Sequence, residues 1–212
     1  MYQTLAPSCA HTGTTPFDLT EIFRDEIQLA LWQRPLPAAI GPWLAEHGPT
    51  LGRGLRQTLR PGTLPDLSAF PPGPGRDALA QDLGLLADML IELLGADQVG
   101  LRLEVIHQAM CPRFHVDRVG LRMLCTYQGP GTEWVEDAQV DRRFLGAGHG
   151  GRPDHLSGLL HPEHQIQTIP PGTIALLKGS LWQGQTGGGI VHRSPAVPHG
   201  LRILAALDAG WN

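Results

Sequence analysis

The sequence predicts an α+β protein with a double-stranded β-helix (jelly-roll) core beneath an N-terminal helical layer. Apolar residues recur at helical spacing in the first half of the chain, whereas about eight short strand patterns separated by turn signals fill the second half. No long helical pattern interrupts those strands. The 212 residues suit one compact unit, with a helical extension at 1–95 and the core at 96–212.

The expected helices lie before residue 95. Apolar residues have a loose helical spacing over 18–31, and Pro35 and Pro37 end that pattern. Shorter helices are expected at 38–47 and 51–59. A Pro- and Gly-rich connector at 61–75 excludes a regular helix, and the clearest helix follows at 76–94, with Gly95 as its C-terminal stop. These helices would bury their apolar stripe against the outer face of a sheet.

The expected strands begin after Gly95, where residues 99–107 alternate between apolar and polar side chains. Further strand patterns occupy 114–119, 121–127, 132–135, 165–169, 173–178, 189–193 and 201–207. A polar insertion at about 136–164 interrupts them. Long loops without structure of their own are often lids, so we expect this insertion to be a mobile loop over the barrel opening.

Composition excludes several classes of function. The net charge is −4, and no basic stripe interleaved with aromatic residues is present, so nucleic acid is not expected as a partner. No apolar run approaches the roughly 20 residues that a membrane helix needs. The N-terminus does not resemble a secretory signal, and the three cysteines are too few for a disulfide framework. We therefore expect a cytoplasmic protein, whose oligomeric state stays open.

A candidate metal site begins in the segment Cys-Pro-Arg-Phe-His-Val-Asp at 111–117. On a strand, His115 and Asp117 point to the same face and could reach one ion. His192, 75 residues after Asp117, is the candidate third ligand. Two histidines and a carboxylate make a facial triad that leaves positions open for a co-substrate and dioxygen. Cys111 is either a fourth, soft ligand that favours zinc or a small buried residue.

Arg202, ten residues after His192, could bind the distal carboxylate of a keto acid, because a guanidinium offers a planar, bidentate fork. The Tyr127 hydroxyl could donate a second hydrogen bond to that carboxylate. The alternative for Arg202 is a salt bridge with Asp208 or Glu133. The alternative for Tyr127 is a packing aromatic residue with a bonded hydroxyl.

Four more residues are candidates for the pocket. Glu133 and Trp134 could line the barrel mouth, or they are ordinary cross-strand positions. Lys178 could contact substrate there, although a solvated charge at the end of a strand is favoured. Arg193 should point away from His192 on a regular strand and form a surface salt bridge.

The order His-x-Asp, a distant His, and an Arg about ten residues later resembles the Fe(II)/2-oxoglutarate dioxygenase superfamily over roughly residues 99–208. The resemblance implies a jelly-roll core in which His115, Asp117 and His192 bind iron. It also implies that Arg202, with Tyr127, anchors 2-oxoglutarate, and it implies no catalytic residue beyond the metal site. The reaction would be hydroxylation or oxidative demethylation of an unidentified substrate.

Four sequence segments of the second half also resemble the bacterial domain-of-unknown-function family 1826. The segments that carry this resemblance are 111–117, 126–134, 177–182 and 191–195. The resemblance supports a shared fold and site but identifies no substrate.

Three rival interpretations stay open. A cupin-like enzyme that uses Zn, Mn or Ni without 2-oxoglutarate predicts that Arg202 is held in a salt bridge and that no keto-acid pocket exists. A non-enzymatic protein of metal homeostasis predicts a closed, four-coordinate site that includes Cys111. A degenerate jelly roll would bind no metal.

Overall fold

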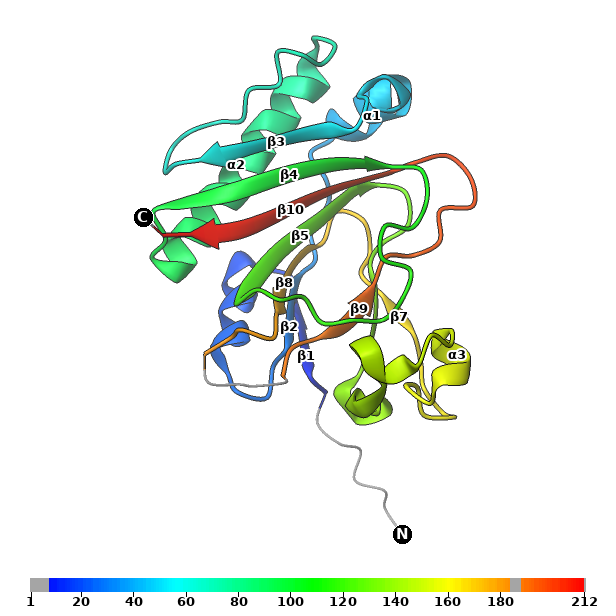
Figure 1. Cartoon of the computed structure of the whole chain (residues 1–212). Coiled ribbons are helices and arrows are strands. Elements are labelled where there is room, and N and C mark those ends of the chain that lie inside the picture. The colour runs from blue at the N-terminus through cyan, green and yellow to red at the C-terminus, as the bar shows by residue number, and fades with distance from the viewer. Residues whose placement is uncertain (1–7, 184–187, 212) are drawn as a thin grey trace.

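Two sheets and a layer of helices make up residues 8–183 and 188–211, which this computed structural model describes (Figure 1). The large sheet has seven strands in the order β1-β2-β8-β5-β10-β4-β3, and the small sheet has three in the order β7-β6-β9. The protein is therefore of the α+β class, as expected. Among the described residues, no helix is both long and apolar enough to cross a membrane.

The strands are β1 (Ala10–Gly13), β2 (Leu29–Trp32), β3 (Gly54–Leu59), β4 (Gln98–Ile106), β5 (Leu121–Gln128), β6 (Glu133–Val135), β7 (Gln167–Thr168), β8 (Ile174–Lys178), β9 (Val191–Arg193) and β10 (Arg202–Gly210). The α-helices are α1 (Ile40–His47), α2 (Pro74–Leu94) and α3 (Asp154–Ser157). The 3₁₀ helices are η1 (Pro16–Phe23), η2 (Gly48–Thr50), η3 (Asp137–Gln139), η4 (Arg142–Phe144) and η5 (Gly146–His149).

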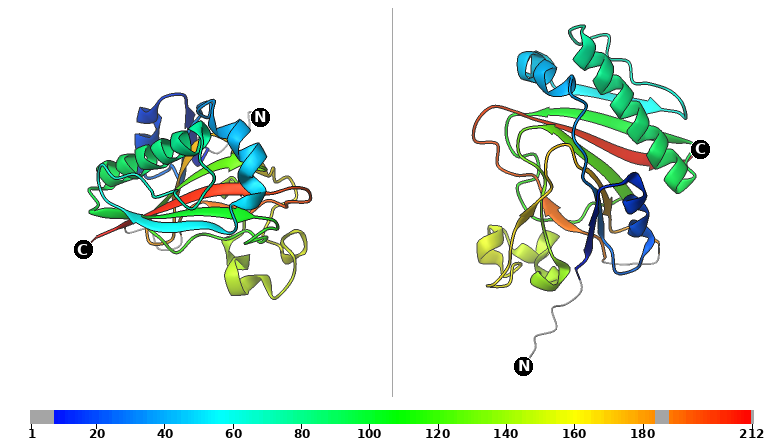
Figure 2. Two further views of the ribbon diagram at one scale, coloured as in Figure 1. Left: turned by 90° about the horizontal axis from the view of Figure 1, so that it is seen from above. Right: turned by 180° about the vertical axis from the view of Figure 1, so that it is seen from behind.

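The long helix α2 covers one face of the large sheet, as Figure 2 shows from above and from behind. It begins at Pro74, whose fixed φ suits the first helical position, and it ends at Gly95 in the left-handed conformation with φ 59°. Its buried side chains, Leu79, Leu83, Leu86 and Leu90 among them, join one core with the helix-facing side chains of the sheet. The prediction of a helix at 76–94 is confirmed.

The opposite face of the large sheet packs against the small sheet. Leu29 and Leu31 of β2 belong to this second core, whereas Ala30 between them belongs to the helix-facing core. This alternation follows from the period of two along a strand. Trp134 of β6 enters the same core from the small sheet. A sheet covered on both faces needs strands that are apolar throughout, and all five residues of β8 are buried.

The expectation that residues 1–95 form a helical extension is wrong in part, because the described residues of this range also contain β1, β2 and β3 of the large sheet. The predicted helix at 18–31 is a 3₁₀ helix followed by strand β2, which lies between β1 and β8. The predicted helix at 51–59 is instead the edge strand β3, which pairs with β4. A short, continuous apolar run fits a doubly covered strand as well as it fits a buried helix, so spacing could not separate the two. Residues 1–7, 184–187 and 212 of the two predicted units lie outside the described residues.

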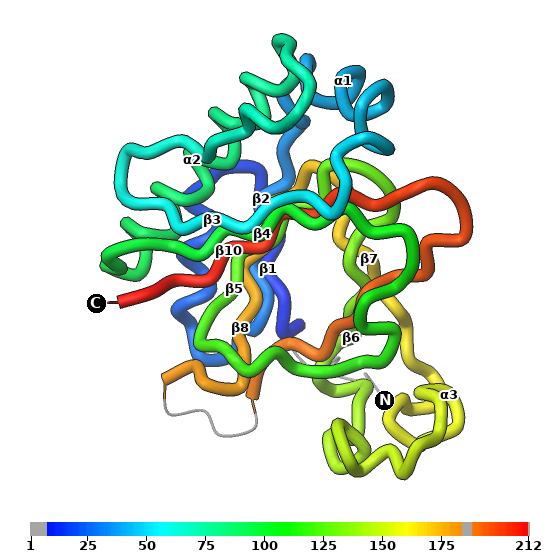
Figure 3. Tube along the Cα trace, turned by 45° about the horizontal axis from the view of Figure 1, so that its top comes forward, coloured from blue at the N-terminus to red at the C-terminus, as the bar shows by residue number. Residues whose placement is uncertain are grey.

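In the second half, seven of the eight strand predictions are confirmed, and the exception is 114–119. That segment forms only an isolated bridge between His115 and His192. The prediction that the insertion lacks structure of its own is also wrong. It contains η3, η4, η5 and α3, and Figure 3 shows it as a lobe beside β6 and β7.

Candidate metal centre

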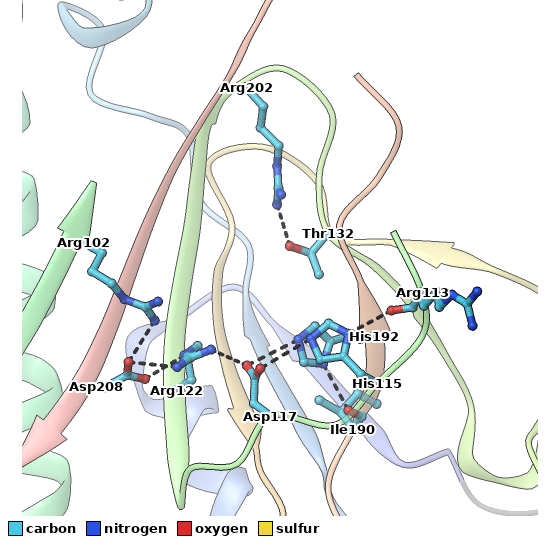
Figure 4. Close-up of polar contacts among 10 residues, drawn as sticks. All are labelled: Arg102, Arg113, His115, Asp117, Arg122, Thr132, Ile190, His192, Arg202 and Asp208. Carbon is cyan, nitrogen blue, oxygen red and sulfur yellow. Dashed lines mark hydrogen bonds and ion pairs between the residues drawn. The ribbon is translucent and has the colours of Figure 1, made fainter. Parts of the chain in front are cut away.

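The structure brings His115, Asp117 and His192 together (Figure 4). One potential ligand atom from each lies within 4.8 Å of the other two. Nε2 of His115 is 3.5 Å from Oδ1 of Asp117, and Nε2 of His192 is 3.5 Å from Oδ2 of Asp117. No other such cluster is found among the described residues. The donor set and the spacing fit one divalent ion between the three side chains.

Backbone pairing aligns the two histidines. The His115 N–H donates to the His192 carbonyl at 2.9 Å, and the His192 N–H donates to the His115 carbonyl at 3.0 Å. A mutually hydrogen-bonded antiparallel pair puts the two side chains on the same face. Asp117, two residues after His115, contributes its carboxylate to that face as well.

The second ring nitrogen of each histidine contacts a backbone carbonyl. Nδ1 of His115 is 2.9 Å from the Arg113 oxygen, and Nδ1 of His192 is 3.1 Å from the Ile190 oxygen. A carbonyl oxygen can only accept, so Nδ1 carries the proton in both rings. In the neutral ring, this proton position leaves the Nε2 lone pair directed at the shared space, which is the arrangement a metal-binding histidine needs.

Asp117 is also held by a chain of charged residues. Nη1 of Arg122 donates to Oδ2 of Asp117 at 2.6 Å. Arg122 also binds both carboxylate oxygens of Asp208, at 2.7 and 2.9 Å, and Arg102 donates to Asp208 at 2.9 Å. Burial alone would raise the pKa of Asp117, but hydrogen bonds and charges from the two histidines and Arg122 hold it well below its usual range. The carboxylate is therefore ionised, as a metal ligand must be.

Arg202 is 1% exposed at the start of β10. Its Nη2 donates to the Thr132 hydroxyl at 2.7 Å and lies 3.4 Å from the Thr126 hydroxyl, while its Nε has no hydrogen-bond partner. No carboxylate pairs with it among residues 8–183 and 188–211, and burial lowers the pKa of Arg202 to about 10. A buried cation without a counter-ion is costly. This guanidinium is therefore suited to a carboxylate that enters from solution.

The predicted salt bridges of Arg202 are absent because its candidate partners bind elsewhere. Asp208 pairs with Arg102 and Arg122, and Glu133 pairs with Arg193 at 2.6 Å. That second pair confirms that Arg193 forms a salt bridge, and Arg193 is also among the residues that line the cavity described below.

A single cavity joins the three clustered side chains to Arg202. Its wall includes the apolar side chains Leu124, Leu204 and Ala206, together with Thr132. Cys111 is exposed and lines the rim, but its sulfur is not part of the His-Asp-His cluster. None of the described residues that line this cavity comes from the insertion 136–164.

Two predicted pocket residues of strand β6 lie elsewhere. Trp134 is buried in the core between the sheets, and Glu133 points outward to Arg193. Neither lines the cavity, so the prediction that they form the barrel mouth is wrong and the cross-strand alternative holds.

Tyr127 does not accompany Arg202. Its hydroxyl donates to Oδ2 of Asp82 at 2.6 Å, and its ring belongs to the helix-facing core. The alternative, a packing aromatic residue with a bonded hydroxyl, is confirmed. The hydroxyl of Thr126, its neighbour in β5, lies 3.4 Å from Nη2 of Arg202 instead.

Lys178 neither contacts the cavity nor is solvated, so both predictions for it are wrong. It is buried, and its Nζ donates to the Arg24 carbonyl at 2.7 Å and lies 5.5 Å from the centre of the Trp182 ring. The segment around η1 covers this end of β8 and takes the amine out of solvent.

Sequence reasoning missed Arg122 and Thr132. Arg122 faces Asp208 across the β5–β10 pair, a relation that appears only when the strand register is known. Thr132 sits in the Gly-Pro-Gly-Thr turn and gave no signal of its own.

Comparisons with known proteins bear on the fold. A family model described as "Protein of unknown function (DUF1826)" matches residues 13–208. The comparison with curated proteins found no match. Among solved structures, the dioxygenase for auxin oxidation in rice is 15% identical with a TM-score of 0.53, over 94% of this chain and 82% of that chain. At that identity the similarity shows a shared fold.

Two other solved structures score lower and add no argument. A Pseudomonas putida prolyl-4-hydroxylase is 14% identical with a TM-score of 0.47, over 93% of this chain and 94% of that chain. HygX from Streptomyces hygroscopicus, solved with nickel and 2-oxoglutarate bound, is 15% identical with a TM-score of 0.41, over 87% and 83% of the two chains.

Proposed function

We propose that this chain, which belongs to the DUF1826 family, is a non-haem Fe(II)- and 2-oxoglutarate-dependent oxygenase. The proposed reaction is hydroxylation or oxidative demethylation of an unidentified substrate. One observation carries the proposal. Arg202, buried and without an acidic partner among the described residues, opens onto the same cavity as the His115–Asp117–His192 cluster.

The fold supports the proposal. We interpret the large and small sheets as the two sheets of a double-stranded β-helix, with the candidate site between them. The rice protein that shares the fold is named as a dioxygenase for auxin oxidation.

The three clustered side chains fit the proposed metal. Nε2 of His115, Nε2 of His192 and an oxygen of Asp117 would hold Fe(II) and leave coordination positions for 2-oxoglutarate and dioxygen. When bound, the metal, 2-oxoglutarate and dioxygen would together supply the oxidising chemistry that attacks a C–H bond, which no side chain can supply. Arg122 keeps one oxygen of Asp117 occupied, which favours binding of the metal through the other oxygen.

Arg202 would hold the distal carboxylate of 2-oxoglutarate. Its Nε lacks a partner and its Nη2 bonds only to threonine hydroxyls, so an incoming carboxylate can accept from the guanidinium without displacing an ion pair. Thr132 is close enough to share that carboxylate. The apolar wall of Leu204, Ala206 and Leu124 limits water around the pair, which strengthens its attraction.

The rival interpretations have less support. The Zn, Mn or Ni enzyme predicted a salt-bridged Arg202, and the described residues contain no such bridge. The four-coordinate site predicted Cys111 as a ligand, and its sulfur lies outside the cluster. The cytoplasmic location and the absence of a nucleic-acid partner stay predictions.

The test is an anaerobic titration of the metal-free protein with Fe(II) and 2-oxoglutarate, followed by the visible charge-transfer absorption of the chelate. We expect the band in the wild type. Arg202→Ala should weaken 2-oxoglutarate binding roughly 10- to 100-fold, because a hydrogen-bonded charge pair is worth about 1.5–3 kcal/mol. Arg202→Lys should recover only part, since an ammonium lacks the planar fork.

Arg56→Ala is the matched control, because Arg56 is an exposed arginine of the same sheet that pairs with Glu104. It should bind as the wild type does. If the wild type binds one equivalent of metal but gives no band with 2-oxoglutarate, the oxygenase proposal fails and a zinc or manganese site takes its place.

A further inference from the structure

The insertion 136–164 packs behind the segments that carry the clustered side chains. Along those segments the side chains alternate. His115, Asp117 and His192 face the cavity, whereas Phe114, Val116 and Val191 pack in a separate core on the other side. The insertion adds Val140, Leu159, Phe144, Leu145 and Leu160 to that core, and Val135 of β6 completes it.

The apolar contacts join the insertion to residues adjacent to both histidines. Phe114 precedes His115 and Val191 precedes His192, and both are almost fully buried with Val140 and Leu159. The core contains few side chains, so loss of the insertion's contribution would leave the backs of both segments exposed to water.

One carboxylate adds a polar link between the same parts. Asp154 of α3 is 8% exposed, and its Oδ2 accepts from the Phe114 backbone N–H at 3.0 Å. The same oxygen lies 3.4 Å from Nη1 of Arg193, the residue after His192. The Arg193 guanidinium in turn lies 4.4 Å from the centre of the Phe114 ring. A single side chain of the insertion therefore contacts the neighbours of both histidines.

These contacts place the insertion on the side of the ligand-bearing segments that faces away from the cavity. No described residue of 136–164 lines the cavity, which argues against the lid expected from sequence. Within the insertion, Val140 and Leu160 form an isolated antiparallel β-bridge. It has the features of a small folding unit that supports the ligand segments from behind.

We propose that the folding of the insertion 136–164 is coupled to metal binding, and that Asp154 is the positioning residue that links the two. If the folded insertion holds His115 and His192 at the spacing the ion needs, then the bound ion must stabilise the insertion by the same factor. The inference rests on the proposed metal site, but on neither the identity of the metal nor the use of 2-oxoglutarate.

The experiment is hydrogen–deuterium exchange of the full chain with and without Mn(II), a redox-stable probe that suits carboxylate and imidazole ligands. Binding affinity is measured in parallel by calorimetry. We expect Mn(II) to slow exchange of the amides in 136–164, about as strongly as it slows those around the two histidines. Wild type that binds one Mn(II) without protection of the insertion would overturn this inference alone. Wild type that binds no Mn(II) would overturn both the inference and the proposed function.

Variants identify the link. Asp154→Ala should weaken Mn(II) binding about tenfold or more and remove the protection of 136–164, because supporting residues around a metal site typically contribute 10- to 100-fold to affinity. Asp154→Asn keeps an oxygen that can accept from the Phe114 N–H and should recover part of both effects. The control is Asp141→Asn, which removes a charge that caps η4 and pairs with Arg143 within the insertion.

The control should leave Mn(II) affinity and protection near wild type. If Asp154→Ala lowers stability but retains Mn(II) affinity and protection, Asp154 is merely structural and the proposed coupling is wrong. The exchange measurement on the wild type tests the coupling between metal binding and the insertion even if Asp154→Ala does not fold.

Discussion

Thr126 and Tyr127 are neighbours in β5 whose side chains leave the sheet on opposite faces. The Thr126 hydroxyl lies 3.4 Å from Nη2 of Arg202, whereas the Tyr127 hydroxyl donates to Asp82 in the helix-facing core. Successive residues of a regular strand alternate in this way, but the choice of face depends on which strands pair and in which register. The chemistry of the tyrosine made it a reasonable partner for a keto acid, and the register excludes it.

Replacement of Tyr127 by Phe tests that assignment. It should leave 2-oxoglutarate affinity within about twofold of wild type, while the free energy of unfolding falls by about 1–2 kcal/mol because a buried hydrogen bond to Asp82 is lost. The measurements are the chelate titration and urea denaturation. A tenfold weaker affinity at unchanged stability would return Tyr127 to the binding site.

His115 gives the metal-free protein a pH dependence. Burial alone would lower the pKa of His115, but its interactions with Asp117 and the Arg113 carbonyl raise it above the ordinary 6.5. The stability from this raised pKa is complete below about pH 6.5 and is lost as the pH rises through the folded-state value. A metal binds the neutral ring, so metal affinity must follow the opposite trend.

We therefore predict two opposite slopes between about pH 6 and pH 8. The free energy of unfolding of the metal-free protein should fall as the pH rises, and Mn(II) affinity should increase. Urea denaturation and calorimetry measure the two quantities, and His115→Gln should flatten the first slope. Stability that rises with pH, with an equal slope in His115→Gln, would contradict this account.

At the scale of elements, a buried charge pair docks α2 on the sheet. Asp82 of α2 binds Arg34, which follows β2, through both carboxylate oxygens at 2.5 and 2.6 Å, and it accepts from Tyr127 of β5. Such a pair costs much of its own attraction in lost hydration, so its presence is weak evidence for stability. Removal of one partner, however, leaves the other charge buried and unpaired.

Asp82→Ala should accordingly lower the free energy of unfolding by about 3–5 kcal/mol. The triple variant Asp82→Leu, Arg34→Met, Tyr127→Phe removes all three polar groups together and should recover most of that loss. Urea denaturation of the two variants and the wild type decides the matter. A triple variant as unstable as Asp82→Ala would mean that the contacts among Arg34, Asp82 and Tyr127 add net stability and do more than neutralise the buried charges.

At the scale of the whole molecule, the large sheet combines strands from both halves of the chain. β2 pairs with β8, and β3 pairs with β4, so neither half contains the complete sheet. The second half also depends on α1 and α2 to cover the outer face of that sheet.

A chain that begins at residue 96 should therefore fail to fold. It would lack β1, β2 and β3, it would expose the edge of β8, and it would leave the helix-facing side chains of β4, β5 and β10 in water. Soluble expression and the cooperativity of urea unfolding measure this. Cooperative unfolding of the fragment would establish residues 96–212 as an independent domain.

Local patterns in the sequence determined several parts of this protein. The alternation of apolar residues in β4, the stripe of α2 with its Gly95 stop, and the His-x-Asp spacing each depend on residues within a few positions of one another. The third member of the cluster, His192, and the buried Arg202 followed from the chemistry that two histidines, a carboxylate and a keto acid require. Their meeting in one cavity is consistent with that reasoning.

Tertiary structure alone decided the rest. It made the apolar run of β2 a strand, turned Tyr127 away from Arg202, buried Lys178 under η1, and set the insertion behind the histidines. Each of these outcomes depends on a partner far away in the chain. Periodicity reports which side chains share a face, because backbone geometry is local. It does not report what covers that face, because the burial that selects the partner is a property of the whole packed molecule.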